Sequence, residues 1–144
     1  MPIIRNQTSP KQPIGLTIPI QDGNSGMFDQ SFDTLTQTKM NIINLLNTRP
    51  GERRFQPTFG SRLWSLTFEQ NLDTIIDVAE NIVSEDISMW IPGVTVTGVT
   101  ATLLTSDEIT ANQDIYRLEI AVQFMINMTK QSDMVNISIN NSTT

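Results

Sequence analysis

Cysteine and histidine are both absent from the 144 residues. Their absence excludes zinc fingers, thiol nucleophiles, Ser/His/Asp catalysis and proton transfer through an imidazole. Basic residues are also few, with nine Lys and Arg against fifteen Asp and Glu and a net charge of −6. Because affinity for nucleic acid comes largely from Lys and Arg that neutralise phosphates, this balance argues against a nucleic-acid partner. We expect no cofactor and no metal.

Long apolar runs are missing too. Four of the seven prolines interrupt the first twenty residues, so no continuous apolar segment typical of a signal peptide forms there. No other stretch approaches the roughly 20 apolar residues of a membrane-spanning helix. The sequence therefore predicts a soluble protein, made in a cytoplasm, without a membrane partner.

Residues 1–30 are rich in Pro, Gln, Gly, Asn and Ser and cannot bury much apolar surface. We interpret them as an extended or disordered N-terminal arm, followed by a single domain over residues 31–144. Ile14, Leu16, Ile18 and Ile20 alternate within the arm. This alternation predicts an extended strand that pairs either with the chain's own body or with a neighbour.

Two helices are predicted in the first part of the domain. Asp33 or Thr34 can cap the first helix, which should end near Asn47 because Pro50 disfavours helical geometry just before it. The second helix should end before Pro92. Its apolar residues recur at the spacing of one helical face: Leu72, Ile75, Ile76, Ala79, Ile82, Val83 and Ile87.

After Pro92 the apolar period changes from helix to strand. We expect strands over residues 94–104 and 116–128, joined by a polar hairpin loop at 105–114. A turn at 129–133 should lead to a short last strand in which Val135, Ile137 and Ile139 alternate with polar residues. The predicted fold is α+β, with two helices packed on a small antiparallel β-meander and an extended N-terminal arm.

The segment 48–68 joins the helices and is unusually dense in aromatic, charged and turn-forming residues. We expect a structured loop with a helical turn at residues 61–66. Its charged side chains are either solvated, pinned to the helices, or partner-binding: Glu52, Arg53, Arg54 and Arg62. Aromatic residues under such a loop are more often core than interface. The aromatic residues of this segment include Phe55, Phe59 and Trp64. We expect Phe59 inside and leave Trp64 open.

Three short motifs stand in register in this segment, with RPGER at 49–53, PTFG at 57–60 and LWSLTFE at 63–69. Together with the order of elements over about residues 16–139, they resemble the baseplate wedge and sheath-initiator family of contractile phage tails. That family includes the wedge component of the type VI secretion baseplate. The resemblance implies a virion structural protein of a myovirus, present in multiple copies in a symmetric baseplate and assembled in the host cytoplasm.

The resemblance also implies the partners, which are other wedge proteins, tail tube or hub proteins, and the first ring of sheath subunits. The last strand has no proline and no charge over 134–140, so it is either an ordinary edge strand or an acceptor for a sheath strand. The residues implied to bind partners are Pro50, Gly51, Glu52, Arg53, Pro57, Phe59, Gly60, Trp90, Pro92, Val135, Ile137 and Ile139.

One departure from the family pattern follows the second helix. Family members often carry Glu-Pro-Arg there, which implies a grip on the central wedge bundle, whereas this chain has Ile91-Pro92-Gly93. The carboxylate and the guanidinium are lost and only the proline remains. Trp90 can replace them with an apolar anchor.

Two other functions compete with the wedge role. Relatives are often labelled lysozyme-like, and glycoside hydrolysis needs two carboxylates about 5 to 9.5 Å apart, one of them in an apolar pocket. Glu52 beside Phe55 is the candidate acid, with Glu69 or Asp73 as its partner. The other alternative, an adaptor of a type VI secretion baseplate, shares the predicted fold. We favour the structural role and expect no enzyme activity.

Overall fold

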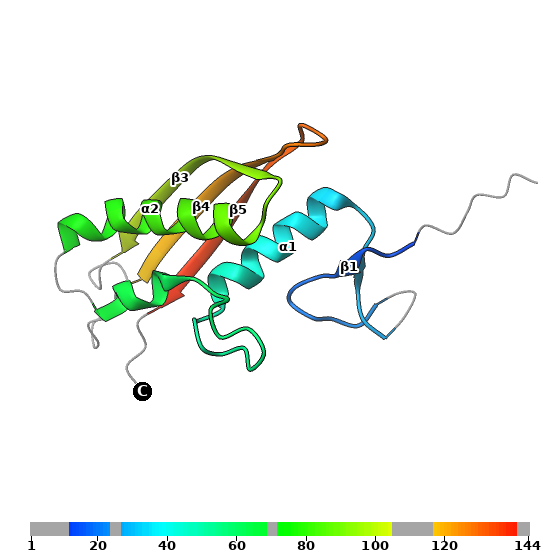
Figure 1. Ribbon diagram of the computed structural model, residues 1–144, viewed down its shortest axis with the longest axis horizontal. Helices are drawn as coiled ribbons and strands as arrows, with labels where there is room; N and C mark the ends of the chain where they lie inside the picture. The colour runs from blue at the N-terminus through cyan, green and yellow to red at the C-terminus, as the bar shows by residue number, and fades with distance from the viewer. Residues whose placement is uncertain (1–11, 24–26, 69–71, 105–116, 141–144) are drawn as a thin grey trace, which may run out of the picture.

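The computed structural model describes residues 12–23, 27–68, 72–104 and 117–140. Its elements confirm the α+β prediction, with two helices, one short 3-10 helix, a two-stranded sheet and a three-stranded antiparallel sheet. Both helices pack on the same face of the larger sheet (Figure 1). The predicted hairpin loop at 105–114 and the first eleven residues of the arm lie outside the described residues.

The first helix, α1, runs over Thr34–Asn47, as predicted. The carboxylate of its N-cap, Asp33, accepts a hydrogen bond from the Thr36 N–H at 3.3 Å, which satisfies one of the free donors of the first turn. At the other end the Thr48 N–H donates to the Leu45 carbonyl. The apolar face of α1 lies fully in the core through Ile42, Leu45 and Leu46.

The second helix, α2, covers Leu72–Trp90 and is preceded by the 3-10 helix η1, Arg62–Phe68. Both agree with the predicted positions. The buried side of α2 repeats every three or four residues and packs against the sheet: Ile75, Ala79, Ile82, Val83 and Ile87. No helix in the described part of the chain is long and apolar enough to cross a membrane.

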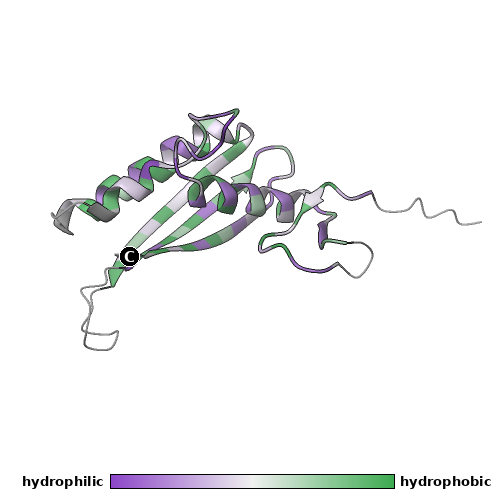
Figure 2. Ribbon diagram, turned by 90° about the horizontal axis from the view of Figure 1, so that it is seen from below, coloured by the Kyte–Doolittle hydropathy of each residue, from purple (hydrophilic) through white to green (hydrophobic). Residues whose placement is uncertain are grey.

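The larger sheet has the order β3-β4-β5, with β3 at Val94–Leu104, β4 at Arg117–Ile126 and β5 at Ser132–Asn140. Buried and exposed positions alternate along β4 and β5, which the alternating colours of the strands in Figure 2 follow. Each fully buried aliphatic side chain contributes about 1.5 to 3 kcal/mol. This sheet face and the two helices form one core.

Two predicted details of the β4–β5 hairpin are wrong. Met128 was predicted as the last apolar residue of the strand, but its side chain is 94% exposed because β4 ends at Ile126 and the chain already turns there. The turn also lies two residues earlier than predicted, at 127–131 instead of 129–133. Ser132 and Asp133 already belong to β5, and Lys130 takes a positive φ of 57° to close the hairpin.

The two outer edges of this sheet differ. On β3 the pairing register shifts between Val96 and Gly98, and the Ala101 N–H faces the carboxylate of Glu80 on α2 at 3.4 Å. A bulge and a charged side chain at an edge both hinder the addition of a further strand. The β3 edge is therefore blocked by the chain itself.

The β5 edge is regular by contrast. The Ile126 N–H donates to the Gln131 carbonyl at 2.8 Å, so these two opposite residues form a hydrogen-bonded pair. Along an antiparallel ladder such pairs alternate with non-hydrogen-bonded pairs. Because the register is continuous, the backbone groups of the odd-numbered β5 residues point to β4, as for Ile137 opposite Ile120. Those of Asn136 and Ser138 point outward, and within the described residues their N–H groups have no partner.

Asp133 ties the beginning of β5 to α1. Its carboxylate accepts a hydrogen bond from Lys39 Nζ at 2.9 Å and another from the Met134 N–H at 2.7 Å. The bond from Lys39, followed by the one from Met134, lowers the pKa of Asp133 below its ordinary value. The outward N–H of Met134 is thus already occupied, so the free part of the β5 edge begins at Asn136.

The described part of the arm folds back on itself. Strand β1, Gly15–Leu16, pairs antiparallel with β2, Gln30–Ser31. We call residues 12–23 and 27–31 the hook, which projects beyond α1 and away from the larger sheet (Figure 1). An extended strand was predicted here. The structure contains the strand β1, which has only two residues and pairs with β2 of the same chain.

Candidate functional site

The loop between α1 and η1 is closed by its own backbone. Ser61 N–H donates to the Thr48 carbonyl at 2.9 Å, and Gly51 N–H donates to the Pro57 carbonyl at 2.7 Å. Gly51 and Gly60 both have positive φ angles, 93° and 132°, which L side chains rarely adopt. Both glycines therefore hold backbone conformations that a side chain would disturb.

Glu52 has a local structural contact. Its carboxylate accepts a hydrogen bond from the Arg49 N–H at 3.0 Å, so it caps the Pro50-Gly51 turn while remaining exposed. Partner binding by Glu52 stays a prediction. The contact shows that a change at this position alters the turn as well as the charge.

Two arginines of the loop lie over aromatic rings. The Arg49 guanidinium carbon is 4.2 Å from the centre of the Trp64 ring, and that of Arg53 is 3.8 Å from the centre of Phe59. Phe59 in turn meets Trp90 edge to face, with ring centres 5.2 Å apart. Such contacts add about 0.5 to 1 kcal/mol each at exposed sites. The loop is thereby fixed against the end of α2.

These contacts bring four of the predicted partner-binding residues together. They line a groove of about 290 Å³ between α1, the loop and the end of α2: Arg53, Phe59, Trp90 and Pro92, joined by Asn41, Asn44, Leu45 and Ile91. Phe59 is partly buried and packs against the core, as expected. The groove combines apolar walls with amide groups and one guanidinium, a composition suited to a protein segment.

Phe55 departs from the general preference of aromatic residues in such a loop for the core. Its side chain is 98% exposed. Phe59 contacts Arg53 and Trp90, whereas Phe55 lies at the surface next to exposed Arg54. A fully exposed Phe on an ordered loop is a candidate interface anchor.

A buried polar cluster that the sequence analysis missed anchors the loop to α2. The Ser61 hydroxyl donates to Asp86 Oδ2 at 2.7 Å, and the Arg62 N–H reaches the same oxygen at 3.3 Å. Asp86 is only 4% exposed. The Arg62 guanidinium lies 2.6 Å from Glu85 and 3.5 Å from Asp86, and these carboxylates, Glu85 first, raise the pKa of Arg62. The available signal was an aspartate within the apolar stripe of α2, next to Ile82, Val83 and Ile87.

Replacing Asp86 by alanine should destabilise the protein by about 3 kcal/mol, because each buried donor left without a partner costs about 1 to 3 kcal/mol. Glu85→Ala is the matched control, since it removes an exposed partner of the same arginine and should cost about 0 to 1 kcal/mol. Thermal denaturation measures both. Equal melting temperatures for the two variants would contradict the anchoring role of Asp86.

The strand residues predicted to bind a partner lie in the core. Val135, Ile137 and Ile139 are buried against the helices, and their backbone groups bond to β4. The residues available at this edge are instead Asn136 and Ser138. The alternation was recognised in the sequence, but which alternate set faces the outer edge depends on the hairpin register.

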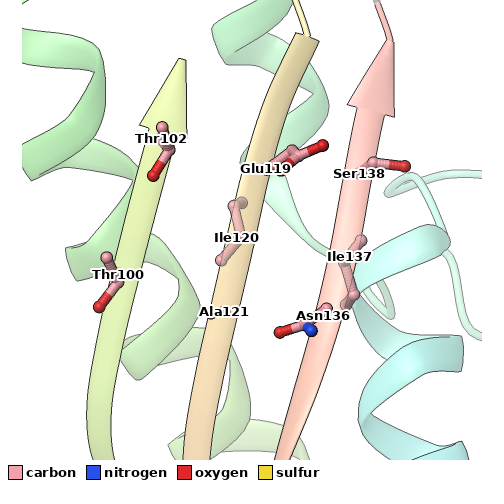
Figure 3. A pocket seen from close by; sticks show the side chains of 8 residues that line it. All are labelled: Thr100, Thr102, Glu119, Ile120, Ala121, Asn136, Ile137 and Ser138. Atoms are coloured by element: carbon pink, nitrogen blue, oxygen red, sulfur yellow. The ribbon is translucent and has the colours of Figure 1, made fainter. Parts of the chain in front are cut away.

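The outer face of the sheet forms a shallow hollow of about 470 Å³, in which Figure 3 shows side chains from all three strands of the sheet. The hollow is lined by Thr100, Thr102, Glu119, Ile120, Ala121, Asn136, Ile137 and Ser138. These are mostly small polar groups with a single carboxylate. The composition is that of a solvated sheet face, and it leaves the β5 edge accessible beside it.

The carboxylates proposed for glycoside hydrolysis are only partly visible. Glu69 and the side chain of Asp73 lie outside the described residues. Phe55 points into solvent, so it forms no apolar pocket around Glu52 of the kind that raises the pKa of a catalytic acid. Among the described residues no group of three or more Asp and Glu could hold a metal ion.

A family model described as baseplate wedge protein gp25 matches residues 36–131, more than half of the chain. A solved structure of a candidate tail lysozyme from Geobacter sulfurreducens is similar with a TM-score of 0.62 and 23% identity, over 74% of this chain and 90% of that one. A chain of the anti-feeding prophage baseplate is similar with a TM-score of 0.59 and 14% identity, over 78% and 83%.

A chain of the type VI secretion baseplate complex aligns at 14% identity with a TM-score of 0.46, over 72% of this chain and 89% of that one. None of the curated proteins matches. At these identities the structural likenesses concern the fold alone, and the first two agree with the α+β architecture described above.

Proposed function

The chain belongs to the gp25 family of baseplate wedge proteins, and from this premise we propose that it docks other wedge proteins through its loop and templates sheath assembly through β5. It is a structural component of a baseplate. The finer assignment rests on two surfaces, the loop with its groove and the free strand edge. They use different elements, so one chain can hold a wedge neighbour and a sheath subunit at the same time.

The observation that supports the templating role is the difference between the two outer edges of the larger sheet. The β3 edge is blocked by its bulge and by Glu80, whereas β5 offers the backbone groups of Asn136 and Ser138. Of the two outer edges of the larger sheet, β5 is therefore the one more open to a strand from another chain. Electron microscopy of tails that carry a variant of this edge is the direct test, and normally sheathed tubes would contradict the proposal.

The mechanism is binding without a chemical step. Free sheath subunits lose translational and rotational entropy when they associate, and this cost slows the first contacts. A ring of wedges holds several β5 edges at fixed positions. After the first sheath subunit has bound, the next subunits bind beside it at a high effective concentration. The protein then acts in the virion tail baseplate after assembly in the host cytoplasm.

Phe55 is the proposed anchor for a wedge neighbour. Phe55→Ala should leave the melting temperature nearly unchanged, because surface substitutions usually alter stability by less than about 0.5 kcal/mol. Co-purification with the neighbouring baseplate proteins should fall about tenfold or more if the ring fills a pocket. Met89→Ala is the matched control, since Met89 is also exposed but lies on α2. Equal recovery of both variants would exclude Phe55 as an anchor.

The lysozyme-like alternative has its own test. The purified chain should not clear a suspension of peptidoglycan, because Phe55 provides no apolar surroundings for Glu52 and binding surfaces account for the loop. Clearing by the wild-type protein that is lost in Glu52→Gln would contradict this expectation. The glutamine retains an acceptor for the Arg49 N–H, so the loss would report on acid chemistry.

A further inference from the structure

The hook carries an unusual amount of exposed apolar surface for an ordered segment. Six large apolar side chains of the hook are exposed: Ile14, Leu16, Ile18, Ile20, Met27 and Phe28. Ile20 is 65% exposed and Met27 is 78% exposed. Figure 2 shows these hydrophobic stretches on a part of the chain that lies away from the sheet. Grouped exposed apolar residues of this kind mark a contact with another molecule.

The hook is held in place by polar contacts. The Thr17 hydroxyl donates to the Asp29 carboxylate at 2.9 Å, and the Asp29 N–H donates to the Gln21 carbonyl at 2.9 Å. Buried Ser31 bonds to the Gln37 side chain on α1, and the Ile18 N–H lies 3.0 Å from the sulfur of Met40. The apolar side chains are thus presented at a fixed position relative to the domain, which lowers the entropy lost on binding.

The charged side chains of the hook have one sign. They are Asp22 and Asp29, and the nearest basic residues in the sequence, Lys11 and Lys39, lie outside the hook. Two copies of the hook brought face to face would place these carboxylates together, which disfavours pairing with a second copy. A basic surface, in contrast, complements them.

The hook is also separate from the matched family region, which begins at residue 36. None of its apolar side chains belongs to the hydrophobic core or packs against it. The proposed contacts of the loop and of β5 use other residues. A contact that covers these side chains would be additional to the two contacts of the proposed function. The inference depends on the proposed function only in that the chain is part of a baseplate, as its family membership indicates.

We propose that the hook docks into an apolar groove rimmed by Lys and Arg on a different baseplate protein. Ile14, Ile20 and Met27 enter the groove, and Asp22 meets its basic rim. The hydrogen bonds from the hook to α1 then hold this partner at a fixed position relative to the domain. The chain is thereby joined to the baseplate at a third place, independent of the loop and of β5.

The proposal is tested with full-length variants in assembled particles. Ile14→Ser combined with Ile20→Ser should lower incorporation into particles about tenfold or more, as expected for the loss of interface anchors. Asp22→Lys should also lower incorporation into particles, and the loss should grow as the salt concentration is reduced. The reason is that repulsion from a basic rim is strongest at low ionic strength. Met128→Ser is the matched control, since Met128 is exposed on the β4–β5 turn. Full incorporation of the double variant would overturn the proposal.

A photoreactive amino acid at Met27 identifies the occupant of the groove. After irradiation of purified particles, mass spectrometry should find crosslinks to one peptide of a different chain that combines apolar residues with nearby Lys or Arg. Crosslinks to a second copy of this chain, to an acidic peptide, or to no protein would each overturn the proposal. The loop variant Phe55→Ala leaves these crosslinks unchanged in the particles that still form, which separates this test from the wedge contact.

Discussion

Asn136→Pro should leave the protein's stability nearly unchanged and produce complete baseplates with bare tail tubes, whereas Ile137→Pro should strongly destabilise the domain. The two positions are adjacent, but their backbone groups point in opposite directions. Ile137 bonds to Ile120 in β4, and its side chain lies in the core. Asn136 faces the outer edge, where proline is tolerated because no intramolecular bond is lost.

The expected magnitudes differ accordingly. Proline at residue 137 removes a ladder hydrogen bond and a buried side chain, at a cost of about 3 kcal/mol or more. For a domain of this size that lowers the melting temperature by roughly 10 °C. Proline at residue 136 should change stability by much less, yet it removes one of the two N–H donors available to a sheath strand.

Asn136→Thr is the control, because it changes the same side chain and keeps the N–H. Circular dichroism gives the stability of each variant and electron microscopy gives the state of the tails. Sheathed tails with Asn136→Pro would contradict templating at β5. Loss of whole baseplates with the same well-folded variant would mean that this edge binds a wedge protein instead.

Gly60→Val should be among the most destabilising changes in the loop. A Cβ at residue 60 would lie 2.6 Å from the carbonyl oxygen of Thr48 and 2.8 Å from backbone atoms of Arg49 and Pro50, and the φ of 132° is itself unfavourable for valine. Backbone strain costs about 1 to 3 kcal/mol and overpacking a similar amount. The sum is about 3 kcal/mol or more, because backbone cannot move aside as a flexible side chain can.

Gly51→Val separates the two contributions. Gly51 also has a positive φ, but a Cβ there meets nothing within 4 Å, so only the backbone strain remains. Thermal denaturation should therefore rank the wild type above Gly51→Val, and Gly51→Val above Gly60→Val. A reversed order would show that the loop adjusts at residue 60 and that its contact with the end of α1 is loose.

Much of the fold could be predicted because periodicity reports directly on burial. The cap at Asp33, the stop before Pro50 and the apolar face of α2 depend on local sequence, and the structure confirms them. The ends of β4 were harder to predict. Met128 continues the alternation in the sequence, but the hairpin closes two residues earlier, and tertiary pairing decides where a strand ends.

The candidate site was less predictable, since it depends on contacts between distant residues. Phe55 and Phe59 are chemically alike and four positions apart, yet only Phe59 meets Trp90, from the far end of α2. Similarly, Asp86 has a buried role only because Ser61 is brought beside it by the loop. For the hook, the alternation of Ile14, Leu16, Ile18 and Ile20 predicted strand geometry but could not reveal which molecule would cover those side chains.

The unequal edges of the sheet also determine how copies of this chain can associate with each other in a concentrated solution. Stacking β5 of one copy on β3 of the next would give an open fibre, but Glu80 and the bulge at Val96 oppose it. The self-pairing that remains is β5 against β5, a two-fold contact that closes on itself. Pairing of this sheet between copies should therefore stop at two chains and should not grow into amyloid-like filaments.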